Sequence, residues 1–140
     1  MKDTEKVKFR LNDGSIEELD LFLYEEECQD EDNVMLEVFI AGNRYTGIAY
    51  SYFEALQQMR EKLERDHIQI LCNGAALDIY PSPMALSMGY GEKAYKLYLG
   101  KPTRMKDLVD IFEYGASLEF CTVEEQNNYY DFWIRSLKRG

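Results

Sequence analysis

The chain is organised around one stretch, residues 68–100, which reads IQILCNGAALDIYPSPMALSMGYGEKAYKLYLG. This stretch holds two of the three prolines, Pro81 and Pro83, and four of the nine glycines. Glycine permits backbone conformations that other residues avoid, whereas proline fixes its own φ and makes the preceding residue extended. We therefore expect tight turns and one stiff loop here, between short strands at 68–72, 77–80 and 93–99.

Four further strand candidates precede this stretch, and turn signals separate them in pairs. Asn12-Asp13-Gly14 and Gly42-Asn43 are typical of the connections in β-hairpins. The strands that they join alternate apolar and polar residues or are rich in strand formers, and they span residues 7–11, 16–24, 35–41 and 44–50. The pattern predicts an antiparallel meander with one buried face, to which the strands around Ile70 and Leu97 are added.

Three helices are predicted to cover this sheet. Ser51 and Glu54 form a capping box at the start of a helix over residues 51–66, and Thr122 and Glu125 form another before 123–138. Between them, apolar residues spaced at i, i+3, i+4 and i+7 from Met105 predict a helix over 104–113. The fold class is therefore α+β, with an antiparallel β-sheet covered by about three helices in one domain, residues 1–140.

Composition limits the class of protein. Of the 140 residues, 46% are hydrophobic and 14% aromatic, which excludes a disordered chain, and the apolar runs are too short to cross a bilayer. The first ten residues are charged where a signal peptide needs an apolar core. We therefore expect a soluble cytoplasmic protein, with no membrane partner and with Cys28, Cys72 and Cys121 as thiols.

The formal net charge of −10 is concentrated in the first part of the chain. Residues 1–50 carry 13 acidic and 5 basic side chains, and ten acidic residues with no Lys or Arg lie from Asp13 to Asp32. Such charge disfavours nucleic acid and steers a basic protein towards the chain. The acidic residues predicted to bind a partner are Glu25, Glu26, Glu27, Asp30, Glu31 and Asp32. The alternative is a solvated face that only keeps the protein soluble.

No catalytic, cofactor or metal motif is completed. The three cysteines and His67 match a Cys₃His zinc set in number, but no C-x-x-C pair exists, and buried or idle thiols are the simpler interpretation. A Cys–His nucleophile would need His67 beside Cys72 or Cys121, and nothing local favours it. Gly89-Tyr90-Gly91 lacks the rest of a phosphate-binding motif. We expect no cofactor and no metal.

The proline-containing loop offers a second candidate surface. Tyrosine and methionine are favoured in recognition surfaces because they bring a large, amphipathic or adaptable contact area. The loop residues predicted to bind a partner are Tyr80, Ser82, Met84, Met88 and Tyr90. The alternative, left open by the sequence, is that the methionines fill the core. A rival function is a small-molecule site or enzyme pocket beside Asn73, Tyr80, Ser82 and Gly89–Gly91.

The order of elements in the second half, from Asn73-Gly74 through Tyr80-Pro81-Ser82 to a last helix that bears Trp133, resembles small bacterial immunity-type proteins. These proteins belong to systems in which bacteria compete by toxins. The resemblance implies a cytoplasmic, non-enzymatic inhibitor that binds the toxin domain of a neighbouring cell. An acidic inhibitor would suit a basic toxin such as a nuclease.

Overall fold

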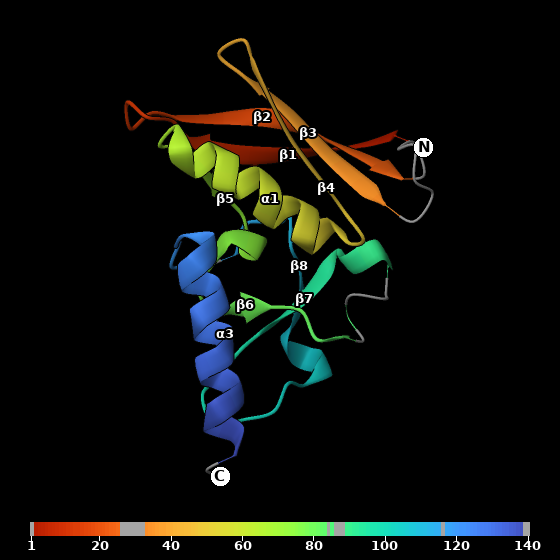
Figure 1. The fold of residues 1–140 in the computed structure, drawn as a ribbon, viewed down its shortest axis with the longest axis vertical. Helices are drawn as coiled ribbons and strands as arrows, with labels where there is room; N and C mark the ends of the chain where they lie inside the picture. Colours follow the sequence, from red (N-terminus) through yellow and green to blue (C-terminus); the bar gives the residue numbers. More distant parts are fainter. Residues whose placement is uncertain (1, 26–32, 84, 86–88, 116, 139–140) are drawn as a thin grey trace.

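The computed structural model describes residues 2–25, 33–83, 85, 89–115 and 117–138. Its larger, upper half in Figure 1 is a five-stranded antiparallel sheet, the main sheet. The strands are β1 (Lys2–Arg10), β2 (Ile16–Glu25), β3 (Val34–Ile40), β4 (Asn43–Ala49) and β5 (Gln69–Leu71), in the order β4-β3-β2-β1-β5. The predicted meander and the added strand around Ile70 are confirmed.

The turn of the β3–β4 hairpin lies one residue earlier than its sequence suggests. Ile40 pairs with Asn43, so the two-residue turn is Ala41-Gly42, one position before the predicted Gly42-Asn43. Both turn residues have positive φ, 51° for Ala41 and 82° for Gly42. Such a turn matches the right-handed twist of the strands on either side, which explains why an alanine tolerates this backbone here.

Helix α1 (Tyr52–Arg65) covers the inner face of the main sheet (Figure 1). Its start is fixed by the Ser51 hydroxyl, which accepts a hydrogen bond from the Glu54 N–H at 3.2 Å. Helix and edge strand approach so closely that a Cβ on Gly47 of β4 would lie 1.9 Å from the Ala55 carbonyl oxygen. The predicted helix at 51–66 is thus confirmed, and it packs on the sheet through backbone contact as well as through its apolar face.

The lower half contains a second, three-stranded antiparallel sheet, which corrects two predictions. Its strands are β6 (Ile79–Tyr80), β7 (Lys93–Lys96) and β8 (Leu108–Asp110), in that order. The strand near Leu97 therefore belongs to this sheet and not to the main one. The helix predicted over 104–113 is wrong: a single 3₁₀ turn, η3 (Met105–Asp107), leads into β8. Pairing of Tyr95 with Leu108 and of Lys93 with Asp110 outweighs the local helical spacing.

Helix α3 (Val123–Leu137) closes the chain as predicted and lies beside β6 in Figure 1. The capping box is complete, because the Thr122 hydroxyl accepts from the Glu125 N–H and the Glu125 carboxylate accepts from the Thr122 N–H. Trp133 packs with Tyr95 and Leu97 in a small second core. The described residues thus contain two long α-helices, where about three were predicted, and neither is long and apolar enough to cross a membrane.

Two segments near the middle adopt irregular structure. Asn73–Ala75 forms a 3₁₀ turn, η1, directly after β5. Among residues 117–121, one β-bridge joins Phe120 to Ala76. Both segments are instead held by hydrogen bonds from side chains, which are described below.

Candidate protein-interaction surface

The structure describes four of the residues predicted to bind a partner, namely Glu25, Tyr80, Ser82 and Tyr90. The others, Glu26, Glu27, Asp30, Glu31, Asp32, Met84 and Met88, lie outside the described residues. The four that are placed fall into two groups. Tyr80 and Ser82 lie on the α3 side of the lower half, and Glu25 and Tyr90 lie near the start of α1.

Tyr80 links the two halves of the molecule. Its ring stacks on Tyr130 of α3 with centroids 4.0 Å apart and meets Phe53 of α1 edge to face at 5.0 Å. Its hydroxyl donates to the Asn127 side-chain oxygen at 2.9 Å, and partial burial raises its pKa. Nearby, the Ser82 hydroxyl accepts from the Ala85 N–H at 3.1 Å. Both side chains therefore make contacts that hold the fold together.

Glu25 and Tyr90 both lie near Tyr52, the first residue of α1. Tyr52 is 1% exposed, and burial raises its pKa strongly, with smaller contributions from the charges of Glu25, Glu92 and Asp3 and from Tyr90. Tyr90 is 39% exposed and has a φ of 57°, in the left-handed region. The end of β2 and the Gly89–Gly91 turn, far apart in sequence, thus meet on one side of the molecule.

A cluster of carboxylates extends from this point along the β1 side of the main sheet, and we call it the acidic rim. Its members come from β1, β2, the start of β7 and the end of β8: Asp3, Glu5, Glu25, Glu92, Asp110 and Glu113. Partial burial raises the pKa of Glu5, as do Asp110, Asp3 and Glu113. Partial burial raises the pKa of Glu92 too, and Asp110, Glu25, Glu5 and Asp3 add to the shift. These groups therefore repel one another.

The acidic rim was only partly visible in the sequence. Glu25 belongs to the acidic stretch from Asp13 to Asp32, but Glu92, Asp110 and Glu113 come from segments with nearly balanced charge. Only the pairing of β8 with β7, and the close approach of Asn73 N–H to the Glu113 carbonyl at 2.8 Å, bring them to the main sheet. One cation lies among them, since Lys93 Nζ is 3.6 Å from Asp110.

A hollow of about 350 Å³ adjoins the rim. It lies where the short β5 ends and is bounded by Glu5 and Lys6 of β1 on one side and by Phe112, Glu113 and Tyr114 on the other. Tyr114 is 65% exposed, so the hollow has an accessible aromatic wall as well as carboxylates.

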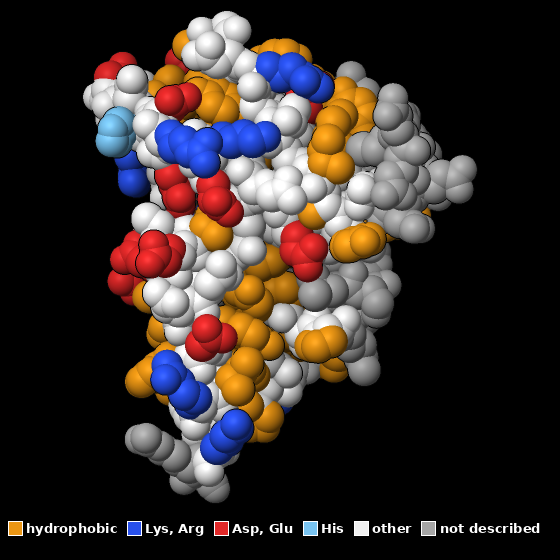
Figure 2. All heavy atoms as spheres, in the orientation of Figure 1, with side chains coloured by type: hydrophobic (Ala, Val, Ile, Leu, Met, Phe, Trp, Pro, Cys, Tyr) orange, Lys and Arg blue, Asp and Glu red, His pale blue; other side chains and the backbone are white. Residues whose placement is uncertain are grey.

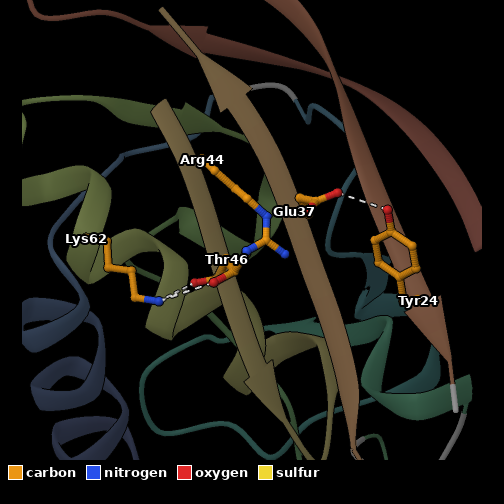
Figure 3. Close-up of polar contacts among 5 residues, drawn as sticks. All are labelled: Tyr24, Glu37, Arg44, Thr46 and Lys62. Atoms are coloured by element: carbon orange, nitrogen blue, oxygen red, sulfur yellow. Dashed lines mark hydrogen bonds and ion pairs between the residues drawn. The ribbon is translucent and has the colours of Figure 1, made fainter. Parts of the chain in front are cut away.

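The outer face of the main sheet has a different character (Figure 3). There the Glu37 carboxylate accepts from the Tyr24 hydroxyl at 2.9 Å and forms an ion pair with Arg44 Nε at 2.5 Å. Glu37 is only 8% exposed, and its charge is balanced by the arginine. This face therefore offers less free negative charge than the rim.

The two described thiols are poor nucleophiles. Complete burial raises the pKa of Cys72 to about 12, and burial raises that of Cys121 to about 11, although the neighbouring Arg60 opposes both shifts. His67 lies in the turn after α1, where its φ is 57°. Among the described residues, no group of three or more His, Cys, Asp or Glu side chains could hold a metal ion.

Two other hollows are present, and the first bears on the hypothesis of a small-molecule site beside Asn73. One of about 430 Å³ is bounded by Asn73, Lys93 and Asp110, but Asn73 already donates to the Asp110 carbonyl at 2.9 Å. Another, of about 620 Å³, lies between Glu61 and Arg65 of α1 and Glu124 of α3. Figure 2 shows acidic side chains on the face where α1 approaches the start of α3.

Comparison with known proteins finds no matching family model and no similar curated protein. What the fold and this surface define is therefore a class: an α+β protein with two antiparallel sheets and a rim of carboxylates at the edge of the larger one.

Proposed function

We propose that this chain is a non-enzymatic, acidic protein-binding module, an inhibitor of the immunity type that binds and neutralises a basic toxin domain, such as a nuclease. The observation that supports it is the acidic rim, in which carboxylates from four separate segments come close enough to raise the pKa of Glu5 and Glu92. Like charges held together destabilise a free protein, and a basic partner offsets that repulsion.

Electrostatic attraction of this kind acts mainly on the rate of association. A concentrated negative surface steers a positively charged partner before contact, and salt screens the effect. Glu25 belongs both to the rim and to the acidic residues predicted from the sequence to bind a partner, and Glu26 and Glu27 follow it directly along the chain.

The test needs a basic toxin domain, sought first among the products of neighbouring genes, with co-expression to score protection from its toxicity and stopped-flow mixing to measure association. Neutralising Glu25, Glu26, Glu27, Asp30, Glu31 and Asp32 together should slow association by about tenfold at low salt and flatten its salt dependence. A matched control neutralises six carboxylates that line neither the rim nor the hollow beside it: Glu17, Glu61, Asp78, Glu119, Glu124 and Asp131. An association rate that falls equally in both variants, or in neither, contradicts the proposal.

A small-molecule site remains the second candidate, because the hollow of about 430 Å³ is bounded by Asn73, a residue expected beside such a pocket. A thermal-shift screen of nucleotides and metabolites separates the two candidates. A ligand that binds only the folded chain must raise its melting temperature. A metabolic gene neighbourhood in place of a toxin gene would likewise favour this candidate.

A further inference from the structure

The two edge strands of the main sheet differ in how far their outward-facing backbone groups are hydrogen-bonded. Along the outer edge of β4, side chains of α1 occupy backbone groups that point away from the sheet. Lys62 Nζ donates to the Thr46 carbonyl at 2.8 Å (Figure 3), and the Ile48 N–H donates to the Gln58 side chain at 3.1 Å. These two contacts oppose the addition of a further strand along this part of the edge.

The opposite edge is only partly covered. β5 pairs with Lys8, Phe9 and Arg10 of β1, and Figure 1 shows β1 continuing past it towards the N-terminus. In the part of the chain that the structure describes, no strand pairs with residues 2–7 on this side. Six residues of β1 thus present an unpaired edge.

The hydrogen-bond pattern shows which backbone groups point outwards. The Leu11 N–H bonds to the Ser15 carbonyl at 2.8 Å, so the odd-numbered residues of β1 bond to β2. Thr4 and Lys6 then turn their backbone groups to the open edge. The Thr4 N–H is occupied by the Asp3 side chain at 2.8 Å, which leaves the Thr4 carbonyl and both backbone groups of Lys6 available.

The surroundings of this edge select the side chains of an added strand. Glu5 lies on the same side of β1 as the core residues Val7 and Phe9, next to Glu113 and Asp110. Lys6 lies on the other side, already paired with Asp20 at 2.6 Å. In an added strand, every second side chain would therefore face the carboxylates of Glu5 and Glu113. The side chains between them would face the Lys6–Asp20 ion pair, whose charges cancel.

We propose that the open edge of β1 binds an extended segment of a basic protein, which adds a strand at Thr4 and Lys6 with Lys or Arg at every second position. The segment occupies the hollow beside Glu5 and Glu113, and its backbone bonds to Lys6 while its cations face the rim. This inference rests on the proposed protein-binding function and specifies where and in what form the partner is recognised.

The probe is a capped heptapeptide that alternates lysine and valine. Two peptides serve as references: one alternates glutamate and valine, and one has the same four lysines and three valines in two blocks. Binding is measured by calorimetry, and exchange of backbone amides by NMR. The alternating lysine peptide should bind most tightly and should slow exchange of the Lys6 amide by about tenfold or more, whereas the Val7 amide, bonded to β2, serves as the internal reference.

Two variants isolate the backbone from the charge. Lys6→Pro removes the outward N–H together with the lysine side chain and should weaken binding by roughly tenfold. Lys6→Ala loses the same side chain but keeps the N–H, and it should bind within about twofold of the parent. Glu113→Lys, at an exposed position, should weaken binding by a similar factor and does not depend on a proline being accommodated.

Each outcome decides between the hypotheses. Equal binding of the blocked and alternating lysine peptides, or an unprotected Lys6 amide in the complex, overturns strand addition but leaves an acidic protein-binding surface intact. Equal binding of the glutamate peptide, or no binding of any peptide, also overturns the inference. The proposed function fails separately, if the rate of association with a basic toxin domain does not depend on salt.

Discussion

The half of the molecule built on the main sheet and the half built on the second sheet reach a packed interior in different ways. Strands β1 to β4 are seven to ten residues long and pair with one another over an apolar core that includes Phe9, Leu36 and Leu56. Strands β6 to β8 have only two to four residues, and side chains complete the backbone hydrogen bonds. The lower half therefore depends on a small number of polar side chains to complete its backbone hydrogen bonds.

Gln126 is the centre of that lower half. It is fully buried, and its side-chain nitrogen lies 2.9 Å from each of the carbonyl oxygens of Gly74, Ala76 and Ile79, which share its two N–H hydrogens. Its oxygen accepts from Arg60, which is 2% exposed and also donates to the Cys121 carbonyl at 2.8 Å. Burial lowers the pKa of Arg60, so the guanidinium depends on these carbonyl oxygens for the hydrogen bonds that water would otherwise provide.

The largest effect is expected at this residue. Gln126→Leu should cost about 4 kcal/mol in the free energy of unfolding, because it leaves the Ile79 carbonyl and part of a buried guanidinium without partners and weakens the bonding of the Gly74 and Ala76 carbonyls, which keep only contacts of 3.4 Å. Urea unfolding measures the loss. The double variant Arg60→Met with Gln126→Leu should recover a substantial part of it, since the buried charge is removed as well. Simple additivity of the two single changes would show that Arg60 and Gln126 do not act together.

In the upper half, the largest loss of stability is expected from a substitution that adds atoms where the packing leaves no space. Gly47→Ala places a Cβ against the backbone of Ala55, which cannot move without shifting α1, and should cost about 3 kcal/mol. Gly42→Ala is the matched control, because its positive φ carries a strain of about 1 kcal/mol but open space surrounds it. Thermal unfolding of the two variants gives the comparison. Equal losses would mean that the close approach of β4 to α1 is not what limits position 47.

A smaller loss is expected where α3 holds the loop after β7. The Trp133 ring nitrogen donates to the carbonyls of Tyr98 at 2.9 Å and of Lys101 at 3.1 Å. Trp133→Phe keeps an aromatic ring but removes the donor, so it should cost about 2 kcal/mol. Phe132→Leu at the exposed neighbouring position should stay within about 0.5 kcal/mol. Chemical denaturation followed by circular dichroism tests both, and a similar effect of the two changes would contradict the argument.

The contrast between the halves also explains what the sequence predicted. The meander, α1 and α3 carry their signals locally, as alternation, turn residues and the capping residues Ser51 and Thr122, and their bounds were predicted closely except at β1. That strand was predicted over 7–11 but begins five residues earlier, at Lys2. Local signals suffice where an element makes most of its hydrogen bonds within itself or with the next strand along the chain.

Local signals failed where distant residues decide the structure. Residues 105–112 carry a helical spacing, but Leu108–Asp110 pair with β7 and the Phe112 N–H bonds to the Asp110 carboxylate at 2.9 Å. The acidic rim was missed for the same reason, because Glu92 and Glu113 join Glu5 only through the fold. Periodicity within one segment contains no information about which segment it will pair with.

The rim itself gives the smallest expected effect, and it depends on pH. A carboxyl whose pKa is higher in the folded than in the unfolded chain binds its proton more tightly when folded, so the stability that it contributes is present at low pH and is lost as the pH rises through the raised pKa. Partial burial and the neighbouring carboxylates raise the pKa of Glu92 in this way. Glu92→Gln should therefore stabilise the chain at pH 7 and change little at pH 4.

Urea midpoints at the two pH values measure this difference, with Asp131→Asn on exposed α3 as the control for a lost surface charge. Stabilisation by Glu92→Gln at pH 7 means that the free protein tolerates the repulsion within the rim, which a basic partner would relieve on binding. Glu92→Gln should then weaken the binding of a basic partner while it raises the free energy of unfolding of the chain. An equal change at both pH values, or a loss of stability at pH 7, would mean that Glu92 is held by attractive contacts and that the rim carries no such repulsion.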